Sequence, residues 1–264
     1  MSTAKQFPAI QNGDGKEFMA SLAKGLAVLS AFNERRPTMS LTEAAGVAGI
    51  SRAAARRVLL TLTELGYVEQ NGREFTLAPR ILELGFGYLS IQPWIERAQP
   101  LLKELSLEFQ ESFSAATLQG SEIVFVARVA APGLVMSSAV AIGMRLPAFH
   151  SALGRIQLGF LHDDEIWARL KAQKLEAFTP STITDLRALF ERVKEDRVQG
   201  FSIVDEELER GLRAIAVPLV TRSGRLLGAI GATAHASRTT RNEMRSGILA
   251  RLKDCSGKIS QLMP

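Results

Sequence analysis

Residues 40–77 constrain the fold most, because several local signals follow one another there without a gap. Ser40 and Glu43 have the spacing of a capping box, so a short helix is expected to begin at this point. Gly49 can end that helix, and Ser51 is a favourable cap for another. Two helices joined by a tight glycine turn are the outline of a helix-turn-helix.

The flanking segments complete this outline. Residues 18–32 place apolar side chains at spacings of three and four, which predicts one buried helix face. After the helix expected at residues 52–65, Asn71 and Gly72 stand between two short strand-like runs, and this is a hairpin signal. Three helices followed by a hairpin predict a winged helix-turn-helix domain, which we expect to span residues 16–78.

The last of these three helices has a basic outer face. Arg52, Arg56 and Arg57 occupy its first half without an acidic residue among them. Arginine can pair with guanine edges or clamp phosphates, and the small Ser51 and Ala53 allow close approach to a duplex. The alternative is that these arginines only solvate a helix face. With the wing in register, we favour contact with double-stranded DNA.

Composition limits the other classes of function. The net charge of +5 and the isoelectric point near 9.6 suit a polyanionic partner, but many proteins that never bind nucleic acid share them. Cys255 is the only cysteine, so an internal disulfide and a cysteine-based zinc cluster are excluded, and no metal or cofactor is expected. Apolar runs such as residues 215–220 are too short to cross a membrane, and residues 1–15 lack the order of a secretory signal. We expect a cytoplasmic protein without a membrane partner.

Residues 79–112 predict a helical linker. Apolar side chains recur there at spacings of three and four, and Pro93 can open a second helix within the segment. The linker is expected to dock either on the following domain or on a partner subunit. Because a winged-helix dimer holds its recognition helices about one DNA turn apart, a linker that also dimerises would set that spacing.

From residue 113 to residue 264 the pattern becomes that of an antiparallel sheet with helices. The apolar period changes to two, with one hairpin around Gly120 and another around residues 221–225. In the second strand of the first hairpin, plain alternation places Phe125 and Arg128 on opposite faces. Helices are expected near residues 151–161, 164–173 and 184–199, and from residue 240 to the end. Antiparallel strands with segregated helices predict an α+β fold.

Residues 143–155 are the most informative part of this second domain, because they predict a loop that leads into a helix start. Ser151 is a suitable cap, and the backbone amides after it could hold a carboxylate. Arg145 could add positive charge there, or it could instead pair with Asp205 or Glu207. A second polar cluster at the ends of the late strands could converge on the same cavity. Its members are Asp205, Glu206, Glu207, Arg213, Thr233 and His235.

An enzyme is the main alternative to a sensor. It would use His150 or His235 with a neighbouring carboxylate as acid and base. No nucleophile stands in a glycine-flanked turn, no metal-ligand spacing occurs, and an isolated histidine is more often structural. We therefore expect no catalytic residue. A further alternative is a DNA-binding architectural protein whose second domain holds no ligand.

The two halves together resemble the isocitrate-lyase-regulator (IclR) family of bacterial transcription factors, from about Ser21 to Met263. The matching segments are residues 21–26 (SLAKGL), 52–57 (RAAARR), 65–68 (LGYV), 143–155 (GMRLPAFHSALGR), 200–207 (GFSIVDEE) and 211–218 (GLRAIAVP). The resemblance implies a GAF-like effector domain and a dimer or dimer of dimers that binds operator DNA.

Residues 145–148 and 233–240 look like the subgroup that controls the catabolism of aromatic acids such as protocatechuate or 4-hydroxybenzoate. This implies a small aromatic carboxylate as effector, with a non-aromatic metabolite such as a 2-oxo acid as the alternative. The chain departs from the subgroup at three positions: Phe149, His150 and Ala152 stand where tyrosine, cysteine and serine are usual.

Two sets of contact residues follow from the local patterns and the resemblance together. The expected DNA-contacting residues are Ser21, Lys24, Ser51, Arg52, Ala53, Arg56, Arg57 and Arg73. The expected ligand-contacting residues are Met144, Arg145, Leu153, Gly154, Asp205, Ala214, Thr233 and His235.

Overall fold

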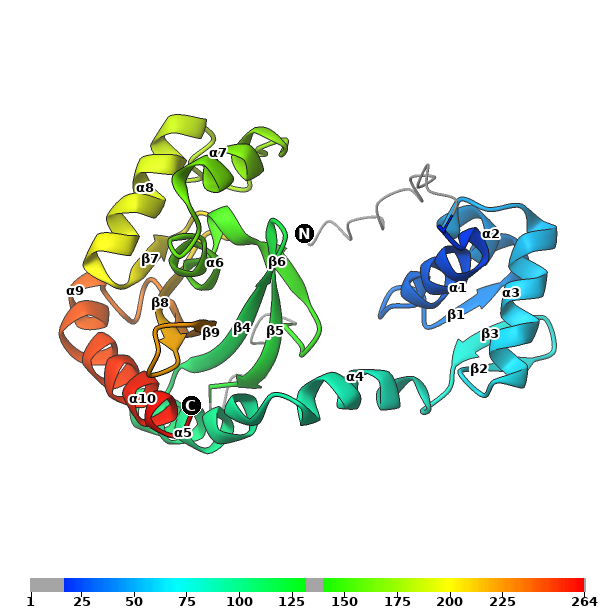
Figure 1. Ribbon diagram of the computed structural model, residues 1–264, viewed down its shortest axis with the longest axis horizontal. Coiled ribbons are helices and arrows are strands. Elements are labelled where there is room, and N and C mark those ends of the chain that lie inside the picture. The colour runs from blue at the N-terminus through cyan, green and yellow to red at the C-terminus, as the bar shows by residue number, and fades with distance from the viewer. Residues whose placement is uncertain (1–16, 132–139, 264) are drawn as a thin grey trace. The chain divides into compact units, whose positions relative to one another are not determined.

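A computed structural model describes residues 17–131 and 140–263 of the 264-residue chain (Figure 1). The chain divides into two compact units, Met1–Ser90 and Ile91–Pro264, so the boundary falls inside the predicted helical linker. Residues 1–15, which the sequence predicts to carry no secretory signal, lie outside the described residues. Among the described helices, none is both long and apolar enough to span a membrane.

The first unit is a helical domain with a small three-stranded sheet. Its elements are α1 (Ala20–Ala31), β1 (Thr38–Ser40), α2 (Leu41–Ala48), α3 (Arg52–Glu64), β2 (Val68–Asn71), β3 (Glu74–Leu77) and α4 (Ile81–Ser90). The antiparallel order β1-β3-β2 adds a short strand that the sequence pattern did not predict. Val28, Met39, Leu59 and Phe75 are buried together at the centre, so helices and wing share one core.

The helix starts of this unit confirm the capping signals in the sequence. The Ser40 hydroxyl accepts from the Glu43 amide, and the Glu43 carboxylate accepts from the Ser40 amide at 2.8 Å, which forms the capping box. Gly49 ends α2 with φ of 65°, a conformation that favours glycine. The Ser51 hydroxyl accepts from the Ala54 amide at 3.2 Å and caps α3. The winged helix-turn-helix prediction is confirmed.

The second unit is an antiparallel six-stranded sheet with helices, as the α+β prediction requires. Its elements are α5 (Pro93–Phe109), β4 (Ser112–Gln119), β5 (Glu122–Val129), β6 (Arg145–Pro147), a 3-10 turn (Ala148–His150), α6 (Ala152–Leu158), α7 (Asp163–Lys171), α8 (Leu186–Gln199), β7 (Ser202–Asp205), β8 (Leu212–Val220), β9 (Leu226–His235), α9 (Arg241–Glu243), a π-helical turn (Met244–Ile248) and α10 (Leu249–Gln261). The strand order is β6-β5-β4-β9-β8-β7, in which β6 and β7 are short strands that were not predicted.

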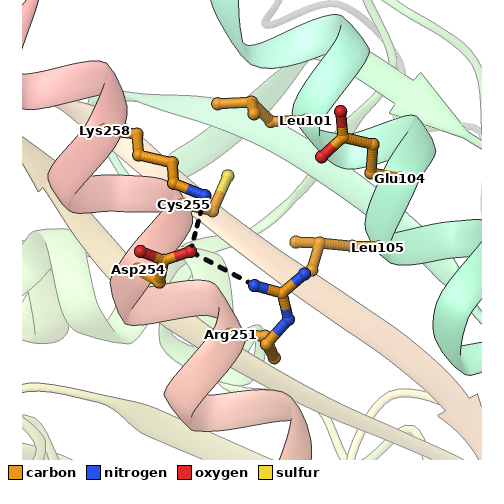
Figure 2. Close-up of a pocket in the computed structure, with 7 residues that line it drawn as sticks. All are labelled: Leu101, Glu104, Leu105, Arg251, Asp254, Cys255 and Lys258. Carbon is orange, nitrogen blue, oxygen red and sulfur yellow. Dashed lines mark hydrogen bonds and ion pairs between the residues drawn. The ribbon is translucent and has the colours of Figure 1, made fainter.

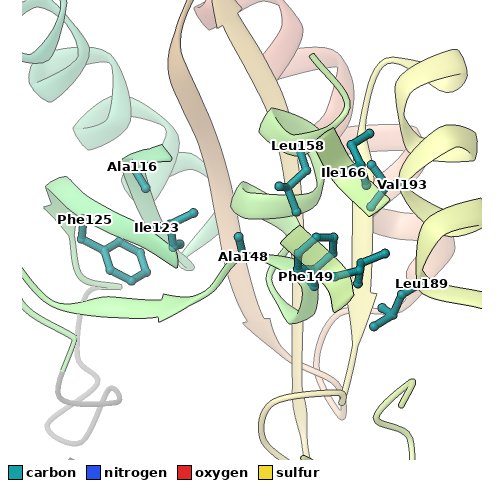
Figure 3. Close-up of a cluster of buried hydrophobic side chains, with 10 residues drawn as sticks. Ala116, Ile123, Phe125, Ala148, Phe149, Leu158, Ile166, Leu189 and Val193 are labelled. Atoms are coloured by element: carbon teal, nitrogen blue, oxygen red, sulfur yellow. The ribbon is translucent and has the colours of Figure 1, made fainter. Parts of the chain in front are cut away.

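Helices lie on both faces of this sheet. Helix α6 packs on one face through a cluster that includes Ala216 and Ala229, and we call this the α6 face. Helix α5 lies against the other face, where a Cβ added to Gly228 would stand 3.1 Å from the Trp94 ring. Helix α10 packs against β8 and α5, so the linker helix α5 docks within its own unit. Figure 3 shows how the core on the α6 face extends from β4 and β5 to α8, where it includes Val193.

A bulge in β5 changes which face its last residues occupy. Ala115 of β4 lies opposite Ala127, but Ala116 lies opposite Phe125, so Val126 has no partner in the ladder. Because one extra residue reverses the alternation, Phe125 and Arg128 lie on the same face, which is the α6 face. The expectation that plain alternation would separate these two side chains is wrong.

Candidate functional site

The outer side of α3 carries the candidate nucleic-acid interface. Arg52, Arg56 and Arg57 are exposed, and none of them forms an ion pair with the rest of the described chain. They point away from the core because Ala54, Ala55, Leu59 and Leu62 supply the buried side of the helix. An arginine without an internal carboxylate remains available for a phosphate or a guanine edge.

The other predicted DNA-contacting residues lie on α1, at the start of α3 and in the wing of the same unit. Ser51 and Ala53 are exposed beside the arginines, and Arg73 is exposed in the turn between β2 and β3. Ser21 is exposed and Lys24 half-buried on α1. The structure thus leaves the whole predicted set accessible at least in part.

In the second unit, three of the predicted ligand-contacting residues lie together. Leu153 of α6 and Ala214 of β8 pack against the same buried cluster, and Ala214 lies directly opposite Thr233 of β9. Met144 packs against the core cluster that Leu153 also touches. His235 lies two residues beyond Thr233 on the same face, but it is exposed and its Nδ1 lies 2.7 Å from the Ser237 hydroxyl.

Gly154 has a packing role. Its amide donates to the Ser151 hydroxyl at 3.0 Å, so the expectation that this amide is free for a carboxylate is wrong. A Cβ at this position would stand 2.3 Å from the carbonyl oxygen of Ala148. Glycine is therefore required where the 3-10 turn crosses the start of α6.

Arg145 and Asp205 face away from this group. Arg145 lies on β6, where Leu146 points to the α6 face and its neighbour points to the opposite one. The Arg145 Nε donates to Glu122 at 2.8 Å, so the alternative in which Arg145 pairs with Asp205 or Glu207 is wrong.

Asp205 also belongs to the opposite face, because its neighbour Val204 contacts the α6 cluster. Its carboxylate accepts from the Nε of Arg213 at 2.7 Å and pairs with Arg241 at 2.8 Å. The predicted polar cluster therefore divides, with Asp205 and Arg213 on one face and Thr233 on the other.

A buried ion pair lies beside the start of α6. Arg155 is 0% exposed, its Nη1 donates to Glu207 at 2.8 Å, its Nη2 donates to the second oxygen of the same carboxylate, and its Nε donates to the Phe149 carbonyl. The Nδ1 of His150 lies 3.9 Å from Glu207, and neither ring nitrogen makes a hydrogen bond within the described chain. Burial alone would raise the pKa of Glu207, but Arg155 and His150 outweigh it and hold that pKa below its ordinary value.

A second buried carboxylate, Asp196 of α8, lies near the same arginine. Burial raises the pKa of Asp196 to about 6, against the opposing effects of the Ser202 hydroxyl and the positive charge of Arg155. Among the described residues, no group of three histidine, cysteine, aspartate or glutamate side chains could hold a metal ion.

Comparison with known proteins identifies both units. The model of the IclR helix-turn-helix domain matches residues 21–72, and the model of the bacterial transcriptional regulator IclR C-terminal domain matches residues 86–261. The chain belongs to the IclR family. The fold class and the resemblance stated from the sequence are confirmed.

Named relatives of this IclR-family protein are transcription regulators. The Pca regulon regulatory protein of Pseudomonas putida is 40% identical over 248 residues, which cover 94% of this chain and 84% of the relative. The p-hydroxybenzoate hydroxylase transcriptional activator of Acinetobacter baylyi is 32% identical over 252 residues, which cover 94% of this chain and 93% of the relative. A solved structure from Rhodococcus sp. RHA1 has a TM-score of 0.81 at 39% identity, covering 92% of this chain and 98% of that chain. The chain is a transcription regulator and not an enzyme.

A hollow between α5 and α10 of this regulator shows no sign of reactive chemistry (Figure 2). Asp254 accepts from Arg251 at 3.2 Å and pairs with Lys258 at 2.9 Å, so the charges at its rim satisfy one another. Burial raises the pKa of the Cys255 thiol to about 12, which keeps it protonated and unreactive. Cys255 is thus a buried thiol within α10.

Sequence reasoning missed four polar residues of the IclR-family effector domain: Arg128 and Ser114, which the strand register places on the α6 face, and the buried Arg155 and Asp196. Arg128 and Ser114 were missed because the bulge in β5 breaks the alternation on which the prediction relied. A charged residue within the apolar run around α6 was the available signal for Arg155, because a buried charge needs a buried partner.

Proposed function

We propose that this protein is a ligand-responsive regulator that binds operator DNA through α3 and the β2–β3 wing and senses a small aromatic carboxylate on the α6 face. The observation that carries the DNA-binding half is the group of three exposed arginines on α3 that have no ion pair within the described chain. In a helix-turn-helix domain this helix enters the major groove. The DNA-binding domain is placed at residues 16–78, with residues 79–112 as linker and 113–264 as effector domain.

The proposed DNA contacts divide into two kinds. Arg56 and Arg57 lie within the first two turns of α3, where a recognition helix reaches base edges. Arg73 of the wing and Lys24 of α1 contact the phosphate backbone, which adds affinity but no sequence preference. Ser51 and Ala53 permit the close approach.

The aromatic effector is supported by the relative named as a p-hydroxybenzoate hydroxylase transcriptional activator and by the chemistry of the α6 face. Leu153, Ala214 and Met144 offer an apolar surface for a ring, and Thr233 offers a hydroxyl beside it. A 2-oxo acid is the alternative effector.

We further propose that the regulator acts as a dimer or a dimer of dimers. In the first unit, large apolar side chains of α4 such as Leu82 and Phe86 are about 70% exposed in the single chain. A contiguous exposed apolar surface is typical of a covered interface. Effector binding would change the spacing of two recognition helices, which requires that the effector bind one arrangement more tightly than the other.

The DNA-binding proposal is tested by exchanging Arg56 for alanine and measuring operator affinity by fluorescence anisotropy at two salt concentrations. Loss of one base-edge contact is expected to cost about 1–3 kcal/mol. Arg187→Ala, an exposed arginine of α8, is the matched control and should leave affinity unchanged. Equal losses in the two variants would overturn the assignment of α3 as recognition helix.

The sensing proposal is tested by the rise in melting temperature of the full chain with 4-hydroxybenzoate, 3,4-dihydroxybenzoate, pyruvate and 2-oxoglutarate. A ligand that binds only the folded state raises the melting temperature with its concentration. A rise with the aromatic acids alone is expected. A rise with the 2-oxo acids alone would replace the aromatic assignment, and no rise with any of them would overturn carboxylate sensing.

A further inference from the structure

The C-terminal helix carries two cations that share one aromatic ring. The guanidinium of Arg245 and the ammonium of Lys253 each lie 5.8 Å from the ring centroid of Phe201, which follows the end of α8 (Figure 1). The two charges are therefore no more than twice this distance apart. Arg245 and Lys253 are exposed and Phe201 is half-buried, so the group lies at the surface. We call these three residues the cationic cluster.

A π-helical turn brings the two cations together. Arg245 lies within this turn, Met244–Ile248, and Lys253 lies eight residues further along the same continuous helix. In a regular α-helix, eight residues at about 100° each would leave the two side chains about 80° apart around the axis. The wider π turn takes up most of this difference, so both cations face Phe201. Single π turns inside α-helices are frequent at functional sites, which indicates a use for this placement.

The carboxylates closest in sequence to these cations are engaged elsewhere. Glu243 belongs to the capping box of its own helix, and Asp254 pairs with Lys258 at 2.9 Å. On the side of the helix that faces α5, Arg251 pairs with Glu108 at 2.8 Å. The two cations of the cationic cluster, in contrast, form no ion pair within the described chain. Like charges without a counter-charge repel each other, so an anion bound between them is favoured.

The surroundings of the cationic cluster favour an acidic peptide over a nucleic acid. Glu243 and Asp254 are exposed close to the two cations in sequence, and they would repel the continuous phosphates of a duplex. A peptide can carry carboxylates only where the cations stand. Val198, in the last turn of α8 and three residues before Phe201, is 88% exposed and offers an apolar contact. Such a contact suits a peptide side chain and not a phosphate backbone.

We propose that the cationic cluster binds an acidic segment of a partner protein. One carboxylate pairs with the planar fork of Arg245, a second pairs with Lys253, and an apolar side chain of the segment packs on Val198 and Phe201. This surface goes beyond the proposed function, because it uses neither α3 nor the α6 face. It leaves the regulator a protein contact while its first unit holds operator DNA.

Fluorescence anisotropy of a labelled probe peptide, titrated with the full chain, tests this proposal. The acidic probe is built from glutamate, leucine and serine, and the comparison probe has glutamine in place of each glutamate. The acidic probe is expected to bind at least about tenfold more tightly than the comparison probe, and added salt should weaken only the acidic probe.

Charge reversal at the cationic cluster is the main variant. The double change Arg245→Glu with Lys253→Glu replaces two attractions by two repulsions and should weaken the acidic probe at least about tenfold. The matched control is Arg187→Glu with Arg222→Glu, which makes the same change in net charge at two other exposed positions and should weaken this probe less than about threefold.

A further variant tests the apolar contact without touching charge. Val198→Ser should weaken both probes about two- to threefold, because both carry leucine. Its side chain is so exposed that folding should not change, which thermal unfolding checks for every variant. If the double variant does not fold, the single change Arg245→Gln takes its place and should weaken the acidic probe alone, about two- to fivefold.

The other possible occupants of the cationic cluster give different results. Equal losses in the double variant and its matched control would show general charge attraction and overturn the proposal. Unchanged peptide binding with weaker binding of a non-operator DNA duplex would assign the surface to nucleic acid instead. Unchanged peptide binding with a changed sedimentation velocity would assign it to a second copy of this chain. Each of these outcomes leaves the proposed roles of α3 and the α6 face as they are.

Discussion

Helices α3 and α6 begin in the same way and end in different surroundings. Each has a serine cap, Ser51 or Ser151, whose hydroxyl accepts from the amide three residues later. Each then carries arginine, but Arg56 of α3 is exposed whereas Arg155 of α6 is completely buried. The local signal therefore specifies where a helix begins, and the tertiary packing decides whether its arginine meets a partner molecule or a carboxylate of its own chain.

The two situations also differ in energy. An exposed arginine keeps its water, so its removal should change folding stability little. A buried guanidinium has lost its water and depends on Glu207 and the Phe149 carbonyl. The α3 arginines can thus be substituted with little loss of folding stability. Substitution of Arg155 without a matching substitution of Glu207 would leave a buried carboxylate without its counter-charge.

The largest expected effect comes from breaking the buried pair. Glu207→Gln leaves the Arg155 charge without its counter-charge and should lower the free energy of unfolding of the second unit by about 3–5 kcal/mol. Urea unfolding followed by circular dichroism measures this change. Glu209→Gln, at an exposed position of the same loop, is the control. A loss below about 1 kcal/mol in the Glu207 variant would contradict the contrast between the helices.

A smaller effect is expected from the second acid near Arg155. Asp196 has a folded-state pKa of about 6, above its ordinary value of 3.8, so the folded protein binds this proton more tightly than the unfolded chain. The stability that this proton contributes is present below about pH 4 and is lost as the pH rises to about 6. The loss is on the order of 2–3 kcal/mol, from about two pK units at roughly 1.4 kcal/mol each.

Urea unfolding at several pH values between 4 and 7 measures this dependence. Asp196→Asn cannot ionise and should lack the slope, so its stability relative to the wild type should increase across this range. Parallel pH curves for the two proteins would show that Asp196 is not the group responsible.

The smallest expected effects come from removing the serine caps of α3 and α6, and they compare an exposed helix start with a buried one. Ser51→Ala should cost about 1 kcal/mol of folding stability, because water can reach the amide that loses its partner. Ser151→Ala should cost more, since the Gly154 amide is buried, loses its shorter hydrogen bond and keeps only the 3.1 Å bond to the Ser151 carbonyl. Thermal unfolding of both variants gives the order. A larger loss in Ser51→Ala would contradict the difference in burial.

Much of the fold could be predicted because its signals are local. Serine caps, glycine turns and the Asn71-Gly72 hairpin fixed the helices and wing of the first unit. Strands β1, β6 and β7 escaped prediction because runs of three or four residues are too short to show alternation. These strands form through pairing with distant partners, which a local pattern does not contain.

The site was less predictable for the same reason. Without β6, nothing indicated that Arg145 and Leu146 point to opposite faces, so Arg145 was assigned to the effector. Without the bulge at Val126, alternation placed Arg128 on the wrong face. Leu153, Ala214 and Thr233 were grouped by family resemblance, and their proximity depends on the register between β8, β9 and α6.

Because of the bulge, deletion of one residue would change which face the end of β5 presents. Loss of the single codon for Val126 would restore strict alternation in β5 and turn Arg128 to the opposite face. A frame-preserving deletion would therefore change which face a half-buried arginine occupies, although the arginine itself remained encoded. In the divergence of such regulators, the number of residues in one strand can then decide which side chains line a face of the sheet as firmly as their identity does.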